Sequence, residues 1–469
     1  DLEIGRKLTS LTIMAIMFAG GMAIGVPSFM PEAASDLSVT DGLLTVSTTT
    51  LQGVAILEIV VNDPDNSDTT VDLAAVSASV GGTSYDLNQA SNGKWYLYLV
   101  DSSQSVLLDA DSTGFEFGFM CDDGLGINES ATDLIVSTSI DVWVATWNAQ
   151  GDTAANGDGS CLDADGMTAV GDDTSGTTER SDLTAAVLQN APSLSNHNDA
   201  TAGQTTLDLG QRGHGLNESG YGSWPYIVSV DLNDDNLVEY GSDSINVVYG
   251  NTDDETSISL VNRNPGDNNE IHLTIVDPAL NIDPTTADMW MFDLSDNDGD
   301  TTTVKFSNNA SFSAGTLSST NAAISAAELG DLGCSANCAL SSDNETYLTT
   351  GLNTVSQVIM TESGANTGVF ESFDVNGNGQ FQTLGEGPSS SGSLADNKTI
   401  FSYGGNSVDM IITYTDATIT FDAGGDWAPG QTATVSVNDW EANRNPTSAE
   451  TLLVGDETVT IPTIKMGTG

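Results

Sequence analysis

Residues 246–284 read NVVYGNTDDETSISLVNRNPGDNNEIHLTIVDPALNIDP, and residues 411–446 read IITYTDATITFDAGGDWAPGQTATVSVNDWEANRNP. Both stretches contain, in the same order, an alternating strand with a tyrosine, a second strand, a Pro-Gly turn, a strand that ends in Asp and an Asn-x-(Asp/Asn)-Pro corner. Period-two alternation predicts half-buried strands, and Gly, Pro and Asn predict the turns that join them. We therefore expect one unit, a β-hairpin that leads into a corner, to recur along the chain.

A weaker copy of this unit lies near the start of the chain. Residues 54–70 read VAILEIVVNDPDNSDTT, with Asp63-Pro64 at the corner. In the two clear copies the strands end at Asp277 and Asp439, about 160 residues apart. That spacing fits large β-sandwiches with elaborated loops, and no convincing amphipathic helix interrupts the pattern. The predicted fold class is all-β.

These patterns predict four segments along the chain. We expect a signal peptide at 1–35, a first β-domain at 36–221 with a long polar excursion at about 148–220, a second β-sandwich at 222–425, and the start of a third, truncated β-domain at 426–469.

The first segment has the pattern of a secretory leader. Arg6 and Lys7 precede an apolar run over 8–26, and small residues follow at 33–35. This order predicts export with cleavage after Ser35, and a retained N-terminal anchor is the alternative. No later stretch approaches the roughly 18 consecutive apolar residues of a membrane span. We expect the mature chain to lie outside the cell, without a membrane span.

The net charge excludes several classes of partner. The chain has 66 acidic and 10 basic residues, which give a formal charge of −56. Such a chain repels nucleic acid and anionic lipid, and it attracts metal ions and small cations. Disorder is not indicated, because 39% of the residues are hydrophobic and they fall in short alternating runs. We expect bound cations to offset the self-repulsion.

The cysteines predict disulfide bonds. An even number of cysteines in an exported chain favours two bridges, here among Cys121, Cys161, Cys334 and Cys338. Locality favours Cys121–Cys161 and Cys334–Cys338 over the two other pairings. A zinc site built from all four is the rival, but the spacing lacks paired C-x-x-C motifs.

The best local candidate for a cation site begins at Asp374. Asp374, Asn376 and Asn378, followed by Gly379, match the first half of the calcium-loop pattern D-x-[DN]-x-[DN]-G. Their oxygens can converge on one Ca²⁺ while glycine permits the sharp turn. The twelfth position is a glycine, and the next glutamate comes one residue late. A metal-free Asx-rich turn is the alternative.

Other oxygen-rich loops are weaker calcium candidates, with the same alternative. Asp231, Asn233 and Asp235 repeat the first half of the pattern, with Glu239 at position nine. Residues 156–165 are similarly rich in Asp and Asn. The run DLSDNDGD supplies Asp293, Asp296, Asp298 and Asp300.

Five N-x-[ST] sequons predict glycosylation of an exported chain, although some arise by chance in a sequence rich in Asn, Ser and Thr. They are Asn128, Asn217, Asn309, Asn344 and Asn397.

No catalytic centre stands out in the sequence. His197, His214 and His272 are not in an H-E-x-x-H spacing, and the chain has neither a G-x-S-x-G elbow nor a Gly-rich phosphate loop with its lysine. Carboxylate pairs are too numerous for one pair to be singled out as an acid and base. We expect the histidines to lie at the surface and the chain not to be an enzyme.

Several segments together resemble the surface-layer (S-layer) proteins of archaea, most closely those of ammonia-oxidising archaea. They are the leader RKLTSLTIMAIMFAGGMAIGVPSFMPEA, the stretch TLQGVAILEIVVNDP, the repeated turn, strand and corner, and TESGANTGVFE (361–371) followed by the strand at 412–416. Residues 148–220 match nothing in that family, and the shared motifs are structural rather than catalytic.

The resemblance implies a chain of immunoglobulin-like β-domains that assembles with itself into a two-dimensional, hexagonal lattice around the cell. Such lattices are often glycosylated and stabilised by divalent metal, and their acidic pores suit the concentration of ammonium. Members of the family are much longer than 469 residues, so we expect this chain to be an N-terminal fragment. The alternative function is an exported adhesin or ligand-binding protein built from the same domains, and an extracellular enzyme comes third.

Overall fold

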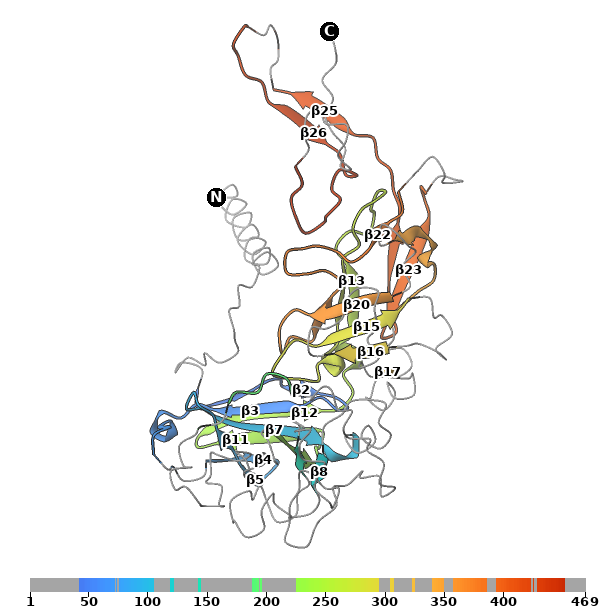
Figure 1. Ribbon diagram of the computed structural model, residues 1–469. Coiled ribbons are helices and arrows are strands. Elements are labelled where there is room, and N and C mark those ends of the chain that lie inside the picture. The colour runs from blue at the N-terminus through green and yellow to red at the C-terminus, as the bar shows by residue number, and fades with distance from the viewer. Residues whose placement is uncertain are drawn as a thin grey trace, which may run out of the picture. The chain divides into compact units, whose positions relative to one another are not determined.

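The computed structural model describes residues 42–71, 73, 76–104, 119–121, 142–144, 188–193, 195, 225–294, 304–307, 323–324, 340–349, 357–385, 394–422, 425 and 428–451. In these ranges the protein is nearly all β-structure, arranged in several separate sheets (Figure 1). The predicted all-β class is therefore confirmed. Within the described ranges, no helix has the length and apolar character needed to cross a bilayer.

The first two sheets form one sandwich. One sheet has the order β1-β3-β7-β10-β9-β8, with β6 also paired to β7, and the other has the order β2-β12-β11-β4-β5. The pairing is mostly antiparallel, but β10 runs parallel to β7 and β12 runs parallel to β2. The strands are β1 (Leu44–Val46), β2 (Thr50–Leu51), β3 (Leu57–Val61), β4 (Ser77–Val80), β5 (Thr83–Asp86), β6 (Asn88–Gln89), β7 (Trp95–Asp101), β8 (Phe119–Cys121), β9 (Val142–Val144), β10 (Tyr226–Val230), β11 (Asp235–Tyr240) and β12 (Asp243–Tyr249).

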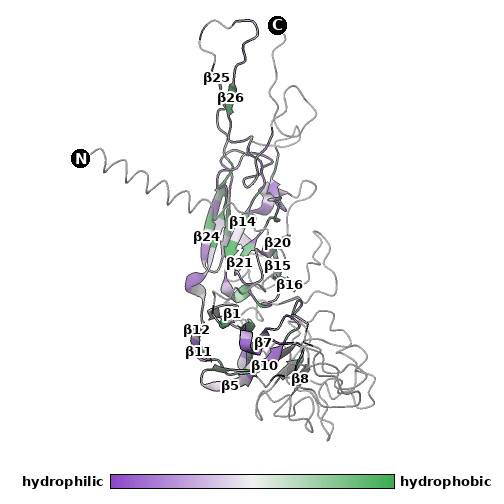
Figure 2. Ribbon diagram, turned by 90° about the vertical axis from the view of Figure 1, so that its left-hand side faces the viewer, coloured by the Kyte–Doolittle hydropathy of each residue, from purple (hydrophilic) through white to green (hydrophobic). Residues whose placement is uncertain are grey.

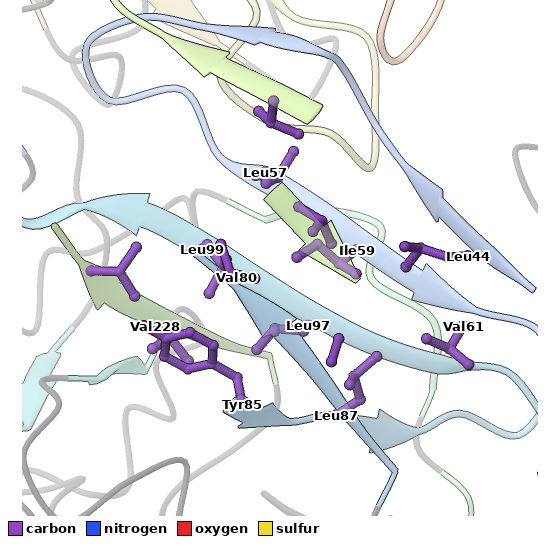
Figure 3. Close-up of a cluster of buried hydrophobic side chains, with 14 of the residues drawn as sticks. Leu44, Leu57, Ile59, Val61, Val80, Tyr85, Leu87, Leu97, Leu99 and Val228 are labelled. Carbon is purple, nitrogen blue, oxygen red and sulfur yellow. The ribbon is translucent and has the colours of Figure 1, made fainter. Parts of the chain in front are cut away.

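Alternation in these strands builds the first core. Leu57, Ile59 and Val61 project from one face of β3, and Leu97 and Leu99 continue that face on β7, because successive side chains of a strand point to opposite faces. They pack in one buried cluster with side chains of the second sheet, among them Val80 and Tyr85, as Figure 3 shows.

The boundary predicted between residues 221 and 222 falls inside this sandwich. Strands β10, β11 and β12 lie beyond it in sequence, yet they pair with β7, β4 and β2. Within the repeated unit 246–284, the tyrosine strand β12 thus belongs to the first sandwich, and the hairpin that follows it opens the next sheet. The repeated unit spans a junction between sheets rather than a single domain.

Three further sheets follow. A seven-stranded sheet has the order β13-β14-β21-β20-β15-β16-β17, a three-stranded sheet has the order β18-β23-β24, and β19 pairs with β22. The strands are β13 (Ser257–Leu260), β14 (Leu273–Val276), β15 (Met289–Asp293), β16 (Val304–Ser307), β17 (Ala323–Ile324), β18 (Ser341–Ser342), β19 (Leu348–Thr349), β20 (Gln357–Glu362), β21 (Val369–Glu371), β22 (Gln382–Thr383), β23 (Lys398–Tyr403) and β24 (Asn406–Ile411).

Aromatic side chains join the larger two of these sheets. Phe292 of β15 meets Tyr403 of β23 edge to face, with ring centroids 6.0 Å apart, and both side chains are fully buried. Trp290, in the same strand as Phe292, is also fully buried, and its indole N–H donates to the carbonyl of Leu280 at 2.8 Å. This core holds the loop around Leu280 against the seven-stranded sheet.

The last two strands form a separate hairpin. β25 (Thr418–Phe421) pairs antiparallel with β26 (Val435–Asn438) (Figure 1). The predicted start of the third β-domain, residue 426, lies between these two strands in sequence.

A capped corner ends the β3 and β14 strands in the same way. Asp63 precedes the 3₁₀ helix η2 (Pro64–Asn66) and accepts the N–H of Asp65, and Asp277 precedes η6 (Pro278–Leu280) and accepts the N–H of Ala279. Proline suits the first helical position, because its missing N–H would have no partner there. The structure thus aligns Asp63-Pro64 with Asp277-Pro278, rather than with the later Asn-x-Asp-Pro corner. Two other 3₁₀ helices are η5 (Asp253–Glu255) and η7 (Glu345–Tyr347).

A tyrosine hydroxyl holds each of these capping carboxylates. Tyr240 of β11 donates to Asp63 Oδ2 at 2.6 Å, and Tyr403 of β23 donates to Asp277 Oδ2, also at 2.6 Å. Asp277 is buried, whereas Asp63 is half-buried. The Tyr240 hydroxyl, with further bonds from Asn66 and Asp65, holds the pKa of Asp63 below its ordinary value. In both places the bond joins the corner to a strand far away in sequence.

We predict that Tyr403→Phe destabilises the protein more than Tyr240→Phe. Removing the hydroxyl at 403 withdraws a charge-assisted bond from a buried carboxylate, which costs about 1–3 kcal/mol, whereas water can replace the bond at 240 at a cost below about 1 kcal/mol. Urea unfolding of both variants measures the difference. Equal losses would show that burial of the corner does not set the strength of this bond.

Candidate functional site

The Asp374 loop forms a closed turn. Asp374 Oδ1 accepts the N–H groups of Asn376 at 2.9 Å and Asn378 at 2.8 Å, and Oδ2 accepts the side-chain amide of Asn378 at 2.8 Å. Partial burial raises the pKa of Asp374, but these hydrogen bonds outweigh it and the net shift is below the ordinary value. The carboxylate is therefore ionised, and both of its oxygens accept hydrogen bonds from within the turn.

The second half of a calcium loop does not follow this turn. Phe373 and Gly379 are joined by a β-bridge, so the loop closes after six residues, and the N–H of Gly379 donates to Glu270 at 2.7 Å. The chain then enters β22, and Phe381, the residue before that strand, is buried. These residues do not fit the twelve-residue geometry in which the last position supplies a bidentate carboxylate. Calcium binding at Asp374, Asn376 and Asn378 stays a prediction, and the described contacts match its alternative, the Asx turn.

The second candidate loop spreads its oxygens along a strand. Asp231 accepts the hydroxyl of Ser102 at 2.5 Å, and Asn233 lies in the turn before β11. Asp235 and Glu239 both lie on the exposed face of β11, four residues apart. At about 3.3 Å per residue their side chains leave the strand some 13 Å apart, too far to share one ion. Asp231, Asn233 and Asp235 are therefore the only members of this set that the turn can bring together.

The other candidates lie mostly outside the described residues. Asp293 ends β15, opposite Gln357 of β20. Cys121 ends β8 and pairs with Val142. Asp296, Asp298, Asp300 and residues 156–165 are not described, and neither are Cys161, Cys334, Cys338 and the sequons at Asn128, Asn217 and Asn309.

The two described sequons are partly exposed. Asn344 caps η7, and its side-chain oxygen accepts the N–H of Thr346, the third residue of its own sequon. Asn397 immediately precedes β23. Glycosylation of either residue stays a prediction.

His272 is buried, so the expectation that it lies at the surface is wrong. Its side chain is enclosed because it sits just before β14 and stacks on Phe373, with ring centroids 4.5 Å apart. Nε2 lies 3.0 Å from a carboxylate oxygen of Glu270, and Nδ1 lies 3.2 Å from the hydroxyl of Thr447. Burial lowers the pKa of His272 and outweighs the opposing effect of Glu270, so the ring is neutral near pH 7.

The chain of hydroxyl, imidazole and carboxylate has the order used in nucleophilic catalysis. Thr447, however, also lies within hydrogen-bond range of the Gly377 carbonyl at 3.3 Å and of Asn445 Oδ1 at 3.1 Å. Asn445 itself donates to the Gly377 carbonyl at 2.5 Å. These contacts describe a structural link between the corner after β26 and the Asp374 loop.

The sequence analysis did not identify a group of buried acids near the seven-stranded sheet. Asp283, Asp288 and Glu362 lie in the segments NIDPTTAD and TESGANTG, whose motifs indicate turns. Their burial depends on contacts between loops about 80 residues apart, which periodicity does not report. The sequence signal that could have pointed to these buried acids was their position, since each lies at a repeated corner or at a glycine-rich turn.

Glu58 is another acid in an unusual environment. It projects from β3 opposite Tyr98 of β7, whose hydroxyl donates to it at 2.8 Å. Burial raises the pKa of Glu58 to about 7, the hydroxyl of Tyr98 lowers it, and the charge of Asp283 raises it further. The folded protein therefore holds a proton at Glu58 under conditions in which the unfolded chain does not.

We predict that stability falls as pH rises from about 4.5 to 7, and that Glu58→Gln reduces this fall. A carboxyl with a raised pKa binds its proton more tightly in the folded state, so folding is favoured below the folded pKa and loses up to about 3 kcal/mol as the group ionises. Urea unfolding at pH 5 and pH 7.5 measures the slope for both proteins. An unchanged slope in the variant would exclude Glu58 as a source.

The β25–β26 hairpin presents an apolar face to solvent. Its cross-strand pairs Ile419–Val437 and Phe421–Val435 lie on one face, and Ile419 and Phe421 are 56% and 58% exposed. Figure 2 colours these residues by their hydropathy. An isolated two-stranded hairpin is only marginally stable in water.

The equivalent face is buried in the previous copy of the repeat. There the pairs are Ile258–Ile275 and Leu260–Leu273. The two residues of β14 are fully buried and Leu260 is 9% exposed, whereas Ile258 is partly exposed. In the described part of the chain, β26 pairs with β25 alone. The β25–β26 hairpin therefore has the apolar pattern of a core element, but in the described part of the chain its apolar face is exposed.

No protein-family model matches this chain, and no curated protein matches it significantly.

Proposed function

We propose that this chain is a structural subunit of a cell-surface S-layer lattice, built from tandem immunoglobulin-like β-sandwich domains and exported from the cell. Divalent cations, with calcium as the candidate, support its assembly, and its acidic surface enriches small cations such as ammonium. The proposal rests first on the exposed apolar face of the β25–β26 hairpin and second on the charge.

The uncovered hairpin supports self-association. Phe421 and Val435 occupy positions that are apolar and buried in β13 and β14, so leaving them in water forfeits the hydrophobic stabilisation of that core. In the proposed lattice, a neighbouring copy of the chain covers this face. Contact between copies through a β-rich element also needs no matching basic surface, which a chain with 10 basic residues does not have.

The charge supports both a requirement for cations and their enrichment. Copies with a net charge of −56 repel one another, and cations between them reduce that repulsion. A surface potential of a few kT raises the concentration of a monovalent cation roughly tenfold within about 8–10 Å at moderate salt. Nanometre-wide openings between subunits lie within that range.

We predict that the double substitution Ile419→Asp and Phe421→Asp abolishes calcium-dependent assembly. The new carboxylates place charge on the face that a neighbour must cover. Electron microscopy and light scattering of the purified chain, with and without millimolar Ca²⁺, measure assembly. Val375→Asp is the matched control, because Val375 is an 88% exposed apolar residue outside the hairpin.

A wild-type chain that stays monomeric at every calcium concentration would contradict the lattice proposal. Scattered particles or single fibres on cell envelopes would instead favour the adhesin or ligand-binding function. Sheets formed equally well by the double variant would show that assembly uses another surface.

We further predict that neutralising the surface carboxylates removes ammonium enrichment. Amidation with a carbodiimide and an uncharged amine eliminates the fixed charge that attracts the cation. Equilibrium dialysis with labelled ammonium at low salt measures retention by assembled material. Equal retention before and after amidation would rule out the electrostatic mechanism.

A further inference from the structure

Three carboxylates are buried together where the loop after η6 meets the loop after β20. Asp283 and Asp288 are fully buried and Glu362 is 3% exposed. Burial raises the pKa of Asp288 well above its ordinary value, and the neighbouring charges of Glu362 and Asp283 add to the effect. Two ion pairs, His272–Glu270 and Lys398–Asp409, lie elsewhere in the described part of the chain.

Backbone N–H groups fix the position of these carboxylates. Asp288 Oδ2 accepts the N–H groups of Ile282 at 2.5 Å and Asp283 at 3.1 Å. Glu362 Oε2 accepts the N–H of Asp288 at 3.2 Å, and Oε1 accepts the N–H of Gly368 at 2.9 Å. Gly368 has a φ of +59°, and a Cβ there would lie 3.3 Å from the backbone of Pro278. The two loops are thus locked together around the acids.

Several oxygen atoms in these two loops lack a donor. Asp288 Oδ1 and Asn281 Oδ1 accept no hydrogen bond from any described residue. Water does not reach them readily, because Asp288 is fully buried and Asn281 is only 8% exposed. Asn366 Oδ1 is buried without a donor as well, while the amide nitrogen of the same side chain donates to the Pro284 carbonyl at 2.8 Å. Buried acceptors are normally satisfied, so these oxygens are available as ligands for a bound cation.

The corner after β26 shows that the fold alone does not require this arrangement. In this later copy, Glu450 is equivalent to Asp288, and Asn445 is equivalent to Asp283. Glu450 accepts the N–H of Asn445. Both residues are partly exposed, and one carboxylate suffices to cap the loop. Two additional buried acids in the earlier corner therefore need a separate explanation.

We propose that the corner formed by residues 281–288 and 362–368 binds a divalent cation of the calcium type. Asp288 Oδ1 is the anionic ligand, Asn281 Oδ1 and Asn366 Oδ1 are neutral ligands, and Asp283 and Glu362 supply further negative charge. No group of three His, Cys, Asp or Glu side chains in the described structure is placed to hold a metal by itself, so amide and carbonyl oxygens or water complete the shell. Calcium accepts such mixed oxygen ligands in flexible geometry, whereas magnesium demands a strict octahedron and keeps its waters.

This site stabilises the individual chain, so it stands or falls independently of the lattice proposal. A cation that binds the folded chain alone raises its melting temperature. At calcium concentrations about 100 times the dissociation constant, the expected rise is roughly 5–10 °C.

Asp288→Asn tests the site, because the amide keeps an oxygen for the N–H groups of Ile282 and Asp283 but removes the charge. In chelator the variant is expected to melt no lower than wild type, since a buried charge is gone. Its calcium-dependent rise is expected to disappear, and equilibrium dialysis with labelled calcium is expected to count one tight site fewer.

Asp65→Asn is the matched control for loss of one acid, because Asp65 is exposed and lies in η2, far away in sequence. Should Asp288→Asn fail to fold, Asn281→Ala is expected to weaken calcium binding about tenfold. A calcium response in Asp288→Asn or Asn281→Ala equal to that of the control overturns the proposal. So does a wild-type chain whose melting temperature calcium leaves unchanged, which would show that a proton alone neutralises the corner.

Discussion

The constraint on which this structure depends is the satisfaction of buried carboxylates by hydrogen-bond donors other than basic side chains. With 66 acids and 10 bases, the chain has too few Lys and Arg side chains to pair with most of its acids. Asp101 accepts the N–H groups of Ser103 and Leu232, and Asp277 accepts the N–H of Ala279 and the hydroxyl of Tyr403. Charge-assisted bonds of this kind are roughly twice as strong as neutral ones. Buried acids therefore hold corners in place instead of being excluded.

The corners in turn position the sheets. The Asp–Pro corner after β3 is joined to β11 through Tyr240, and the one after β14 is joined to β23 through Tyr403. Each bond connects the end of one strand to another sheet, so the corner sets how the two layers of that region meet. At Asp288 the nearby N–H groups satisfy only one of the two carboxylate oxygens, and no described residue donates to the other.

Much of this fold could be predicted from the sequence, because alternation and turn residues are local signals. The hairpins β13–β14 and β25–β26 and the capped corners follow directly from them. The domain boundary could not be predicted in this way. Tyr249 adjoins the next hairpin in sequence, but its strand pairs with residues 50–51, nearly 200 positions earlier. Such pairing depends on loop closure rather than on local pattern.

In the candidate sites, too, local features could be predicted from the sequence, whereas features that depend on distant contacts could not. The Asx pattern at Asp374 correctly predicted a tight turn, but it could not tell whether the oxygens face a metal or the loop's own N–H groups. The buried acids at 283, 288 and 362 look like ordinary turn residues in sequence, because their burial arises from two loops that meet only in the folded chain. His272 was misplaced for the same reason, since Phe373, which covers it, lies about 100 residues away.

The cation dependence that we propose accounts for both the acidic surface and the buried carboxylates that lack a basic partner. The most direct test is the melting temperature of the purified chain in calcium chloride against sodium chloride of equal ionic strength. Specific binding predicts that millimolar Ca²⁺ stabilises the chain well beyond the matched sodium salt. Equal melting temperatures in the two salts would mean that cations only screen the charge, and they would contradict the account.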